Sequence, residues 1–129
     1  TLREDVRSMR ERMRAELSKS KRGEFDLKQD AGGITDIEFL AQYWTLLWAE
    51  RHAELVTYSD NIRQLESLAS ICLVPQAQVD VLTAAYRAYR QRMHHLSLEG
   101  GDSIAPAAEF ADTRAVVGAI WRETMEPGG

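Results

Sequence analysis

The sequence predicts an all-α fold, a bundle of about five helices with one short extended segment near residues 24–29. Two observations support this class. Apolar residues recur at spacings of three and four over most of the chain, which is the period of a helix with one buried face. Only residues 24–29 alternate between apolar and polar side chains, as a strand does. The length of 129 residues suits one domain, so residues 1–129 are expected to form a single helical domain.

The first helix is expected at residues 2–19. Its apolar residues follow a four-three spacing and should form one buried stripe, made of Leu2, Val6, Met9, Met13 and Leu17. Residues 24–29 come next, with Phe25 and Leu27 on one side and polar residues on the other. Because nothing else in the chain alternates convincingly, this strand is expected to have no ladder partner here. It would be an extended connector, or an edge strand of a sheet outside the chain.

A second helix should begin after two adjacent glycines, with Thr35 as its N-cap. Glu38, three residues later, completes a T-x-x-E capping box. Ile34 and Phe39 occupy the two positions of a hydrophobic staple. A wide apolar stripe then continues to about residue 53, which predicts that this helix is the central one.

Three further helices are expected. Ser59 or Asp60 should cap the third, and Pro75 should open the fourth from a position in its first turn. The fourth helix has the spacing of a bundle seam, formed by Val79, Leu82, Tyr86, Tyr89, Met93 and Leu96. The longest loop, "EGGDSIAP", precedes a last helix at about residues 111–125. Its inward residues are expected to be Val116, Val117, Ile120 and Trp121.

The charge of the chain bounds its partners. The net charge is −4, which argues against nucleic acid and against anionic membrane surfaces as general partners. Residues 1–28 carry a balance of +3, however, and the remainder carries −7. Cys72 is the only cysteine, so no intrachain disulfide is possible and a reducing, cytoplasmic setting is expected. Its apolar surroundings predict an inert core thiol.

The residues that carry chemistry do not form a catalytic or metal centre. His94 and His95 are adjacent, so they diverge on a helix, and His95 with Glu99 lacks a third ligand. The sequence has no P-loop and no credible nucleophile–base arrangement. We therefore expect no catalytic residue, no metal ligand and no cofactor held by this chain.

Two features remain open to a binding role. Arg87, Arg90 and Arg92 belong either to a solvated face or to a cationic patch for an acidic partner or for the phosphates of a nucleotide. The glycine pair Gly32–Gly33 permits positive φ and a close approach of another backbone in what would be an exposed lead-in to the second helix. Nearby carboxylates would repel a phosphate there unless a cation intervened.

One segment carries a family resemblance. The stretch "FDLKQDAGGITDIEFLAQY" resembles the signature of the glutamine synthetase adenylyltransferase family. The likeness continues through "YSDNIRQLESLA", "LTAAYRAYRQRMHHLSL" and "EFADTRAVVGAIWRE", which together cover nearly the whole chain in order. In that family each of two similar halves has a nucleotidyltransferase domain followed by a helical domain. Thr35 and Asp36 resemble the C-terminal, adenylylating half, since the other half typically has Arg-Glu there.

The resemblance implies a parent enzyme that attaches AMP from ATP, with Mg, to a tyrosine of glutamine synthetase and so regulates nitrogen assimilation. Glutamine and the PII signalling protein set its direction. The metal-binding carboxylates of such enzymes lie in the preceding nucleotidyltransferase domain, in a pattern that this chain lacks. The chain is therefore expected to be a fragment of a larger enzyme, and to be inactive by itself.

The resemblance also implies a junction with the preceding domain. The residues expected to mark it are Lys28, Gly32, Gly33, Asp36, Glu38 and Gln42. Two roles remain open at this point. The domain would either help to hold nucleotide or glutamine synthetase beside the catalytic domain, or act as a non-catalytic regulatory bundle that binds PII or glutamine.

Overall fold

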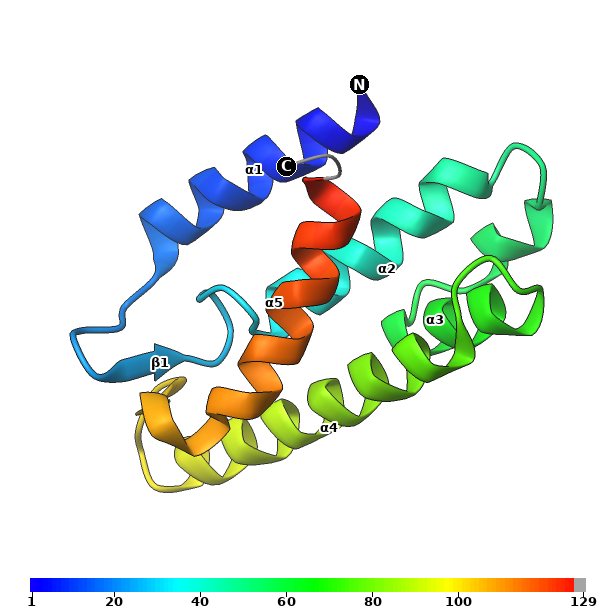
Figure 1. Ribbon diagram of the computed structural model, residues 1–129. Helices are drawn as coiled ribbons and strands as arrows, with labels where there is room; N and C mark the ends of the chain where they lie inside the picture. Colours follow the sequence, from blue (N-terminus) through cyan, green and yellow to red (C-terminus); the bar gives the residue numbers. More distant parts are fainter. Residues whose placement is uncertain (127–129) are drawn as a thin grey trace.

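The computed structural model describes residues 1–126 and confirms an all-α bundle with five α-helices and a two-stranded sheet (Figure 1). The α-helices are α1 (Leu2–Leu17), α2 (Ile34–Trp48), α3 (Asn61–Ser70), α4 (Gln76–Leu98) and α5 (Ala111–Met125). The short elements are the strands β1 (Glu24–Asp26) and β2 (Ile104–Pro106) and the 3₁₀ turns η1 (Ala53–Thr57) and η2 (Ala107–Phe110). Helix α2 is central, since it contacts α1, α3, α4 and α5.

The core is one cluster of apolar side chains around α2 and α4. The predicted seam of α4 is confirmed: Val79, Leu82, Tyr86 and Tyr89 are buried, and the last two members of the seam are partly buried against the cluster. On α5, however, Val116 is exposed, so its predicted inward position is wrong. Within the described residues, no helix is both long and apolar enough to cross a membrane.

Strand β1 is in the predicted place, but the expectation that it has no partner is wrong. It pairs with β2 in antiparallel register, and Phe25 lies opposite Ala105. Phe25 and Leu27 are fully buried inside this chain, so the side chains of the strand serve its own core. The partner escaped detection because β2 is three residues long and ends at Pro106, too short to show an alternation.

The predicted buried stripe of α1 is also wrong. Leu2, Met9 and Leu17 are exposed, whereas Arg10 is completely buried. The helix is rotated so that Arg10 points into the core, where it pairs with the carboxylate of Asp36. The apolar spacing predicted a helix correctly, but not the face that packs on α2.

The start of α2 differs from the predicted capping box. Gly33 is the N-cap and makes no side-chain cap bond, so Thr35 is the second residue of the helix and is not its cap. Ile34 and Phe39 therefore do not occupy the positions of a hydrophobic staple. The reason is that the first-turn amides already have backbone partners. The amide of Ile34 donates to the Leu27 carbonyl at 2.8 Å, and that of Thr35 donates to the Lys28 carbonyl at 3.2 Å.

The other helix boundaries are close to those predicted. Helix α2 ends at Trp48, about five residues early, and Pro75 is the N-cap of α4. Asp60 caps α3 as predicted, accepting the Arg63 amide at 3.1 Å. Cys72 is exposed with φ of 61°, so the predicted core thiol is wrong. It lies where the chain reverses after α3, and the apolar residues beside it face inward instead.

Candidate functional site

The glycine turn between β1 and α2 is buried against α5. Gly32 has φ of +82°, a conformation that favours glycine, and a Cβ there would lie 2.7 Å from the Arg114 carbonyl oxygen. Gly33 has φ of −89°, so positive φ does not explain it. A Cβ at Gly33 would lie 2.5 Å from the Leu27 carbonyl oxygen. Both glycines are thus required by close packing within the chain, and the expectation of an exposed lead-in is wrong.

An ion pair between Arg10 and Asp36 lies beneath this turn. Arg10 Nε donates to Asp36 Oδ1 at 2.6 Å, and both side chains are almost completely buried. The other carboxylate oxygen of Asp36 accepts the Gly32 amide at 2.7 Å, and Arg10 also donates to the Gln29 carbonyl. Burial lowers the pKa of the Arg10 guanidinium, while the charge of Asp36 acts in the opposite direction. Asp36 therefore holds the turn from inside, and each of its carboxylate oxygens has a partner within the chain.

Two further carboxylates organise the same loop. Asp26 accepts the amides of Lys28 and Gln29 through Oδ1, and the Ser103 hydroxyl at 2.8 Å through the same atom. Asp30 accepts the Asp26 amide at 2.8 Å. Burial opposes the ionisation of Asp30, yet hydrogen bonds from two serines and from the Asp26 amide, together with the charge of Arg114, hold its pKa below the ordinary value. Most of the carboxylates that stand out in the sequence are therefore internal.

Two residues that sequence reasoning missed close the turn from outside. The Tyr89 hydroxyl donates to the Gly32 carbonyl at 2.8 Å, and burial raises the pKa of this hydroxyl. Arg114 Nε donates to the Ala31 carbonyl at 3.1 Å, and its guanidinium lies 4.1 Å from the centre of the Phe25 ring. Tyr89 was visible as a seam residue, but nothing local in the sequence signals the partner of its hydroxyl.

Lys28 and Arg90 are exposed and Glu38 is partly exposed, and we call these three side chains the charged face. Glu38 is half-buried and accepts the Asn61 amide group at 3.3 Å. Burial raises the pKa of Glu38, and the nearby charges of Lys28 and Arg90 oppose this shift. Gln42 follows one turn later on α2 and is exposed. Of the predicted junction residues, Lys28, Glu38 and Gln42 thus keep exposed surface, as does Arg90 of α4.

The three arginines of α4 have different neighbours. Arg92 pairs with Glu109 of η2, with Nε 2.7 Å from the carboxylate, and so it is neutralised. The Arg90 guanidinium lies over the Tyr86 ring, 5.6 Å from its centre. Arg87 lines a groove between α3 and α4 together with Glu66 and Asp80. Only Arg90 joins the charged face. No group of three His, Cys, Asp or Glu side chains suited to a metal occurs in residues 1–126.

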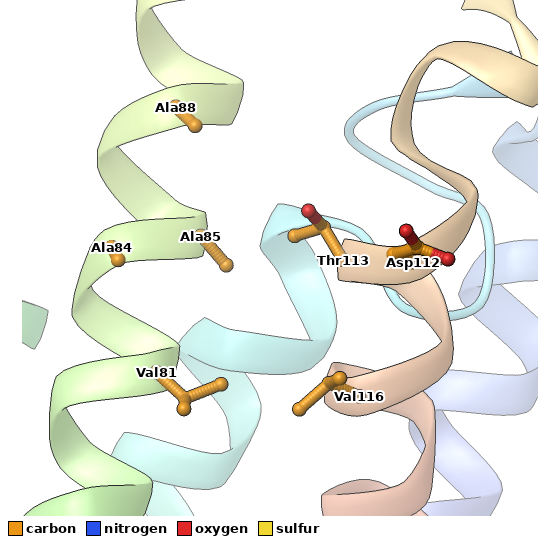
Figure 2. A pocket seen from close by; sticks show the side chains of 7 residues that line it. All are labelled: Val81, Ala84, Ala85, Ala88, Asp112, Thr113 and Val116. Atoms are coloured by element: carbon orange, nitrogen blue, oxygen red, sulfur yellow. The ribbon is translucent and has the colours of Figure 1, made fainter.

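The surface groove between α4 and α5 contains none of the predicted site residues. Figure 2 shows alanines and Val81 of α4 facing Thr113 and Val116 of α5 across it. Its volume is about 430 Å³, and its lining is mostly apolar. It accounts for the exposure of Val116, but it has no cluster of polar groups that would orient a ligand.

Comparison with known proteins identifies the family. The model of the family described as GlnD PII-uridylyltransferase matches residues 2–103. A bifunctional glutamine synthetase adenylyltransferase/adenylyl-removing enzyme of Thioalkalivibrio sulfidiphilus is 46% identical over 127 residues, which are 98% of this chain and 13% of that protein. Proteins of the same name from Methylococcus capsulatus and Nitrosococcus oceani are 43% and 42% identical over 95% and 97% of the chain, again 13% of each relative.

The chain thus spans about an eighth of the length of the curated relatives that it matches. The family model and the curated relatives agree with the resemblance that the segment around the glycine turn carries. In this segment the buried pair of Arg10 and Asp36 organises the start of α2. On these matches, the chain belongs to the family described as GlnD PII-uridylyltransferase, and it is similar over nearly its whole length to a segment of glutamine synthetase adenylyltransferases.

Proposed function

We propose that this chain is the C-terminal helical domain of the adenylylating half of an enzyme that transfers AMP from ATP to a tyrosine of glutamine synthetase. The observation that carries the proposal is the 46% identity over 127 residues to a protein named for this activity. Thr35 and Asp36 after the glycine pair favour the adenylylating half over the adenylyl-removing half. Such an enzyme regulates nitrogen assimilation in the cytoplasm.

In this proposal the chemistry belongs to a preceding nucleotidyltransferase domain, which would hold ATP and Mg. In-line transfer of a nucleotidyl group needs carboxylates fixed close together around metal ions. The carboxylates of Asp26, Asp30 and Asp36 are instead consumed by hydrogen bonds within the turn. The isolated chain is therefore expected to be inactive.

The proposed role of the chain is to present the charged face to the catalytic domain. The buried Arg10–Asp36 pair and the two glycines fix the loop that precedes α2, and the charge of Lys28 in this loop acts on Glu38. Lys28 and Arg90 carry positive charge that suits the phosphates of a bound nucleotide or an acidic surface of glutamine synthetase. Side chains that position a substrate need a rigid support of this kind, because small displacements of such side chains lower the reaction rate.

The test uses the full-length enzyme that contains this chain. Lys28→Met should lower the rate of adenylylation by about 10-fold or more, because it removes a charge placed at the catalytic junction. Lys21→Met is the matched control, since Lys21 is exposed in the loop before β1 and far from Glu38 in sequence. A Lys28 variant that is as fast as the control variant would contradict the role of the charged face.

The alternative is a non-catalytic regulatory bundle that binds PII or glutamine. The matching family is described as GlnD PII-uridylyltransferase, and the mention of PII favours this reading for a partner. Calorimetry of the chain with PII, and separately with glutamine, distinguishes the two proposals. Binding of PII or glutamine to the chain alone, combined with an unchanged rate for Lys28→Met, would favour the regulatory bundle.

A further inference from the structure

Beyond Glu38, helix α2 is uncharged although part of it faces outward. From Phe39 to its end at Trp48 it contains no charged residue, yet Leu46 is 59% exposed and Leu47 is 44% exposed. A helix that is apolar on all sides is normally buried on all sides. Helices α1, α3, α4 and α5 cover the rest of α2, so the exposed strip is the part without a cover.

A groove between α1 and α2 includes Leu46 of this strip. Its volume is about 280 Å³. It is lined from both helices by mostly apolar side chains, namely Leu2, Asp5, Val6, Met9, Phe39, Gln42, Tyr43 and Leu46. Leu2 and Met9 belong to the stripe of α1 whose spacing predicts burial, although Met9 is 51% exposed. The apolar pattern of both helices therefore points to a cover that lies outside the 129 residues.

We propose that this α1–α2 groove is the docking surface for another domain of the same polypeptide, one that presents a mostly apolar surface with hydrogen-bonding groups for Asp5 and Gln42. The inference rests on the proposed function in two respects, that the chain is part of a longer enzyme and that the charged face contacts another of its domains. The relatives are long enough to supply such a domain, because this chain matches only 13% of their length.

Continuity with the charged face favours the same polypeptide over a separate partner. Gln42 lines the groove and lies one helical turn after Glu38, so the groove and the charged face meet on α2. Another domain would then contact Lys28 and Glu38 at the polar rim of the interface. The same domain would cover Met9 and Leu46 at the centre of the interface, from which water is excluded. This division is the usual anatomy of a protein interface.

Hydroxyl-radical footprinting tests the proposal directly. Labelling of Met9 and Leu46 should be strong in the 129-residue chain and about 5-fold weaker in the full-length protein, as half-exposed side chains become buried. Leu98, which is 72% exposed at the end of α4, is the internal control and should label equally in both. Equal labelling of Met9 in the two proteins would overturn the proposal. Protection that appears in the chain alone and grows with its concentration would assign the groove to a second copy, which also overturns it.

A matched pair of variants separates docking from folding. Leu46→Gln and Leu98→Gln should both leave the urea midpoint of the isolated chain unchanged, since both side chains are exposed. In the full-length protein, Leu46→Gln should increase the labelling of Met9 several-fold, as an uncharged polar group enters the dry centre, and Leu98→Gln should not. Unfolding of the isolated chain by Leu46→Gln would show that Leu46 serves the core, against the proposal. If the full-length protein protects Met9 but does not adenylylate glutamine synthetase, the proposed function fails while the docking surface stands.

Discussion

Asp36→Asn is the substitution that most directly probes the interior of the glycine turn. The carboxylate of Asp36 accepts two hydrogen bonds, one from Arg10 Nε at 2.6 Å and one from the Gly32 amide at 2.7 Å. An asparagine has one acceptor oxygen and one donor group, so it satisfies only one of these two donors. It also leaves the guanidinium of Arg10 buried without its counter-charge.

The magnitude follows from these two losses. Removing one partner of a buried ion pair costs about 3–5 kcal/mol. We expect the lower end, about 3 kcal/mol, because Arg10 keeps its bond to the Gln29 carbonyl and the nearby charge of Asp30. With a urea m-value of about 1.5–2 kcal/mol per molar for a domain of this size, the midpoint should fall by about 1.5–2 M.

The assay is urea denaturation at pH 7 followed by far-ultraviolet circular dichroism. Arg12→Met, an exposed arginine on the same helix, is the control and should change the midpoint little. The double variant Arg10→Met/Asp36→Leu should lose less unfolding free energy than the sum of the losses of Arg10→Met and Asp36→Leu measured separately. In the double variant neither charged group is left buried without its partner. A midpoint of Asp36→Asn equal to that of the parent, or strictly additive costs, would refute the buried pair.

Three further variants of the isolated chain test the same region. Tyr89→Phe should lower the free energy of unfolding by about 1 kcal/mol through loss of the bond to the Gly32 carbonyl, and an unchanged urea midpoint would argue against that bond. Gly33→Ala should cost about 2–3 kcal/mol, since its Cβ would lie 2.5 Å from a carbonyl oxygen, and a midpoint like that of the parent would show that the loop yields easily. Glu38→Gln should stabilise the chain at pH 7. Because the folded-state pKa of Glu38 is raised, the ionised carboxylate destabilises the folded chain above that pKa, and this destabilisation vanishes below the ordinary pKa of 4.5. If Glu38→Gln still stabilises the chain at pH 4 or lower, this account is contradicted.

The helices were predictable because their signals are local. The three-four spacing of α4 and the Asp60 cap of α3 depend on residues within a few positions of one another, and both were correctly predicted. The rotation of α1 was not, because it depends on a pairing of Arg10 with Asp36 across 26 positions. Its apolar stripe faces a groove at the surface instead of the core.

The sequence pattern singled out the segment around the glycine pair, but it did not reveal the contacts of its residues. The glycine pair and its carboxylates do mark an organised segment. That Asp36 points inward, and that Thr35 caps nothing, follow from the Leu27 and Lys28 carbonyls, which fold back onto the first turn of α2. Tyr89 meets the turn across 57 positions in sequence, so no local pattern reveals its contribution.

The central claim, that this chain is a non-catalytic helical domain of an adenylyltransferase, is tested most directly by labelling glutamine synthetase with AMP. Purified synthetase is incubated with Mg and ATP labelled at the α-phosphate, together with either the full-length protein or the 129-residue chain. The account predicts label on the synthetase with the full-length protein and none above background with the chain. No transfer by the full-length protein, or transfer by the chain alone, would contradict it.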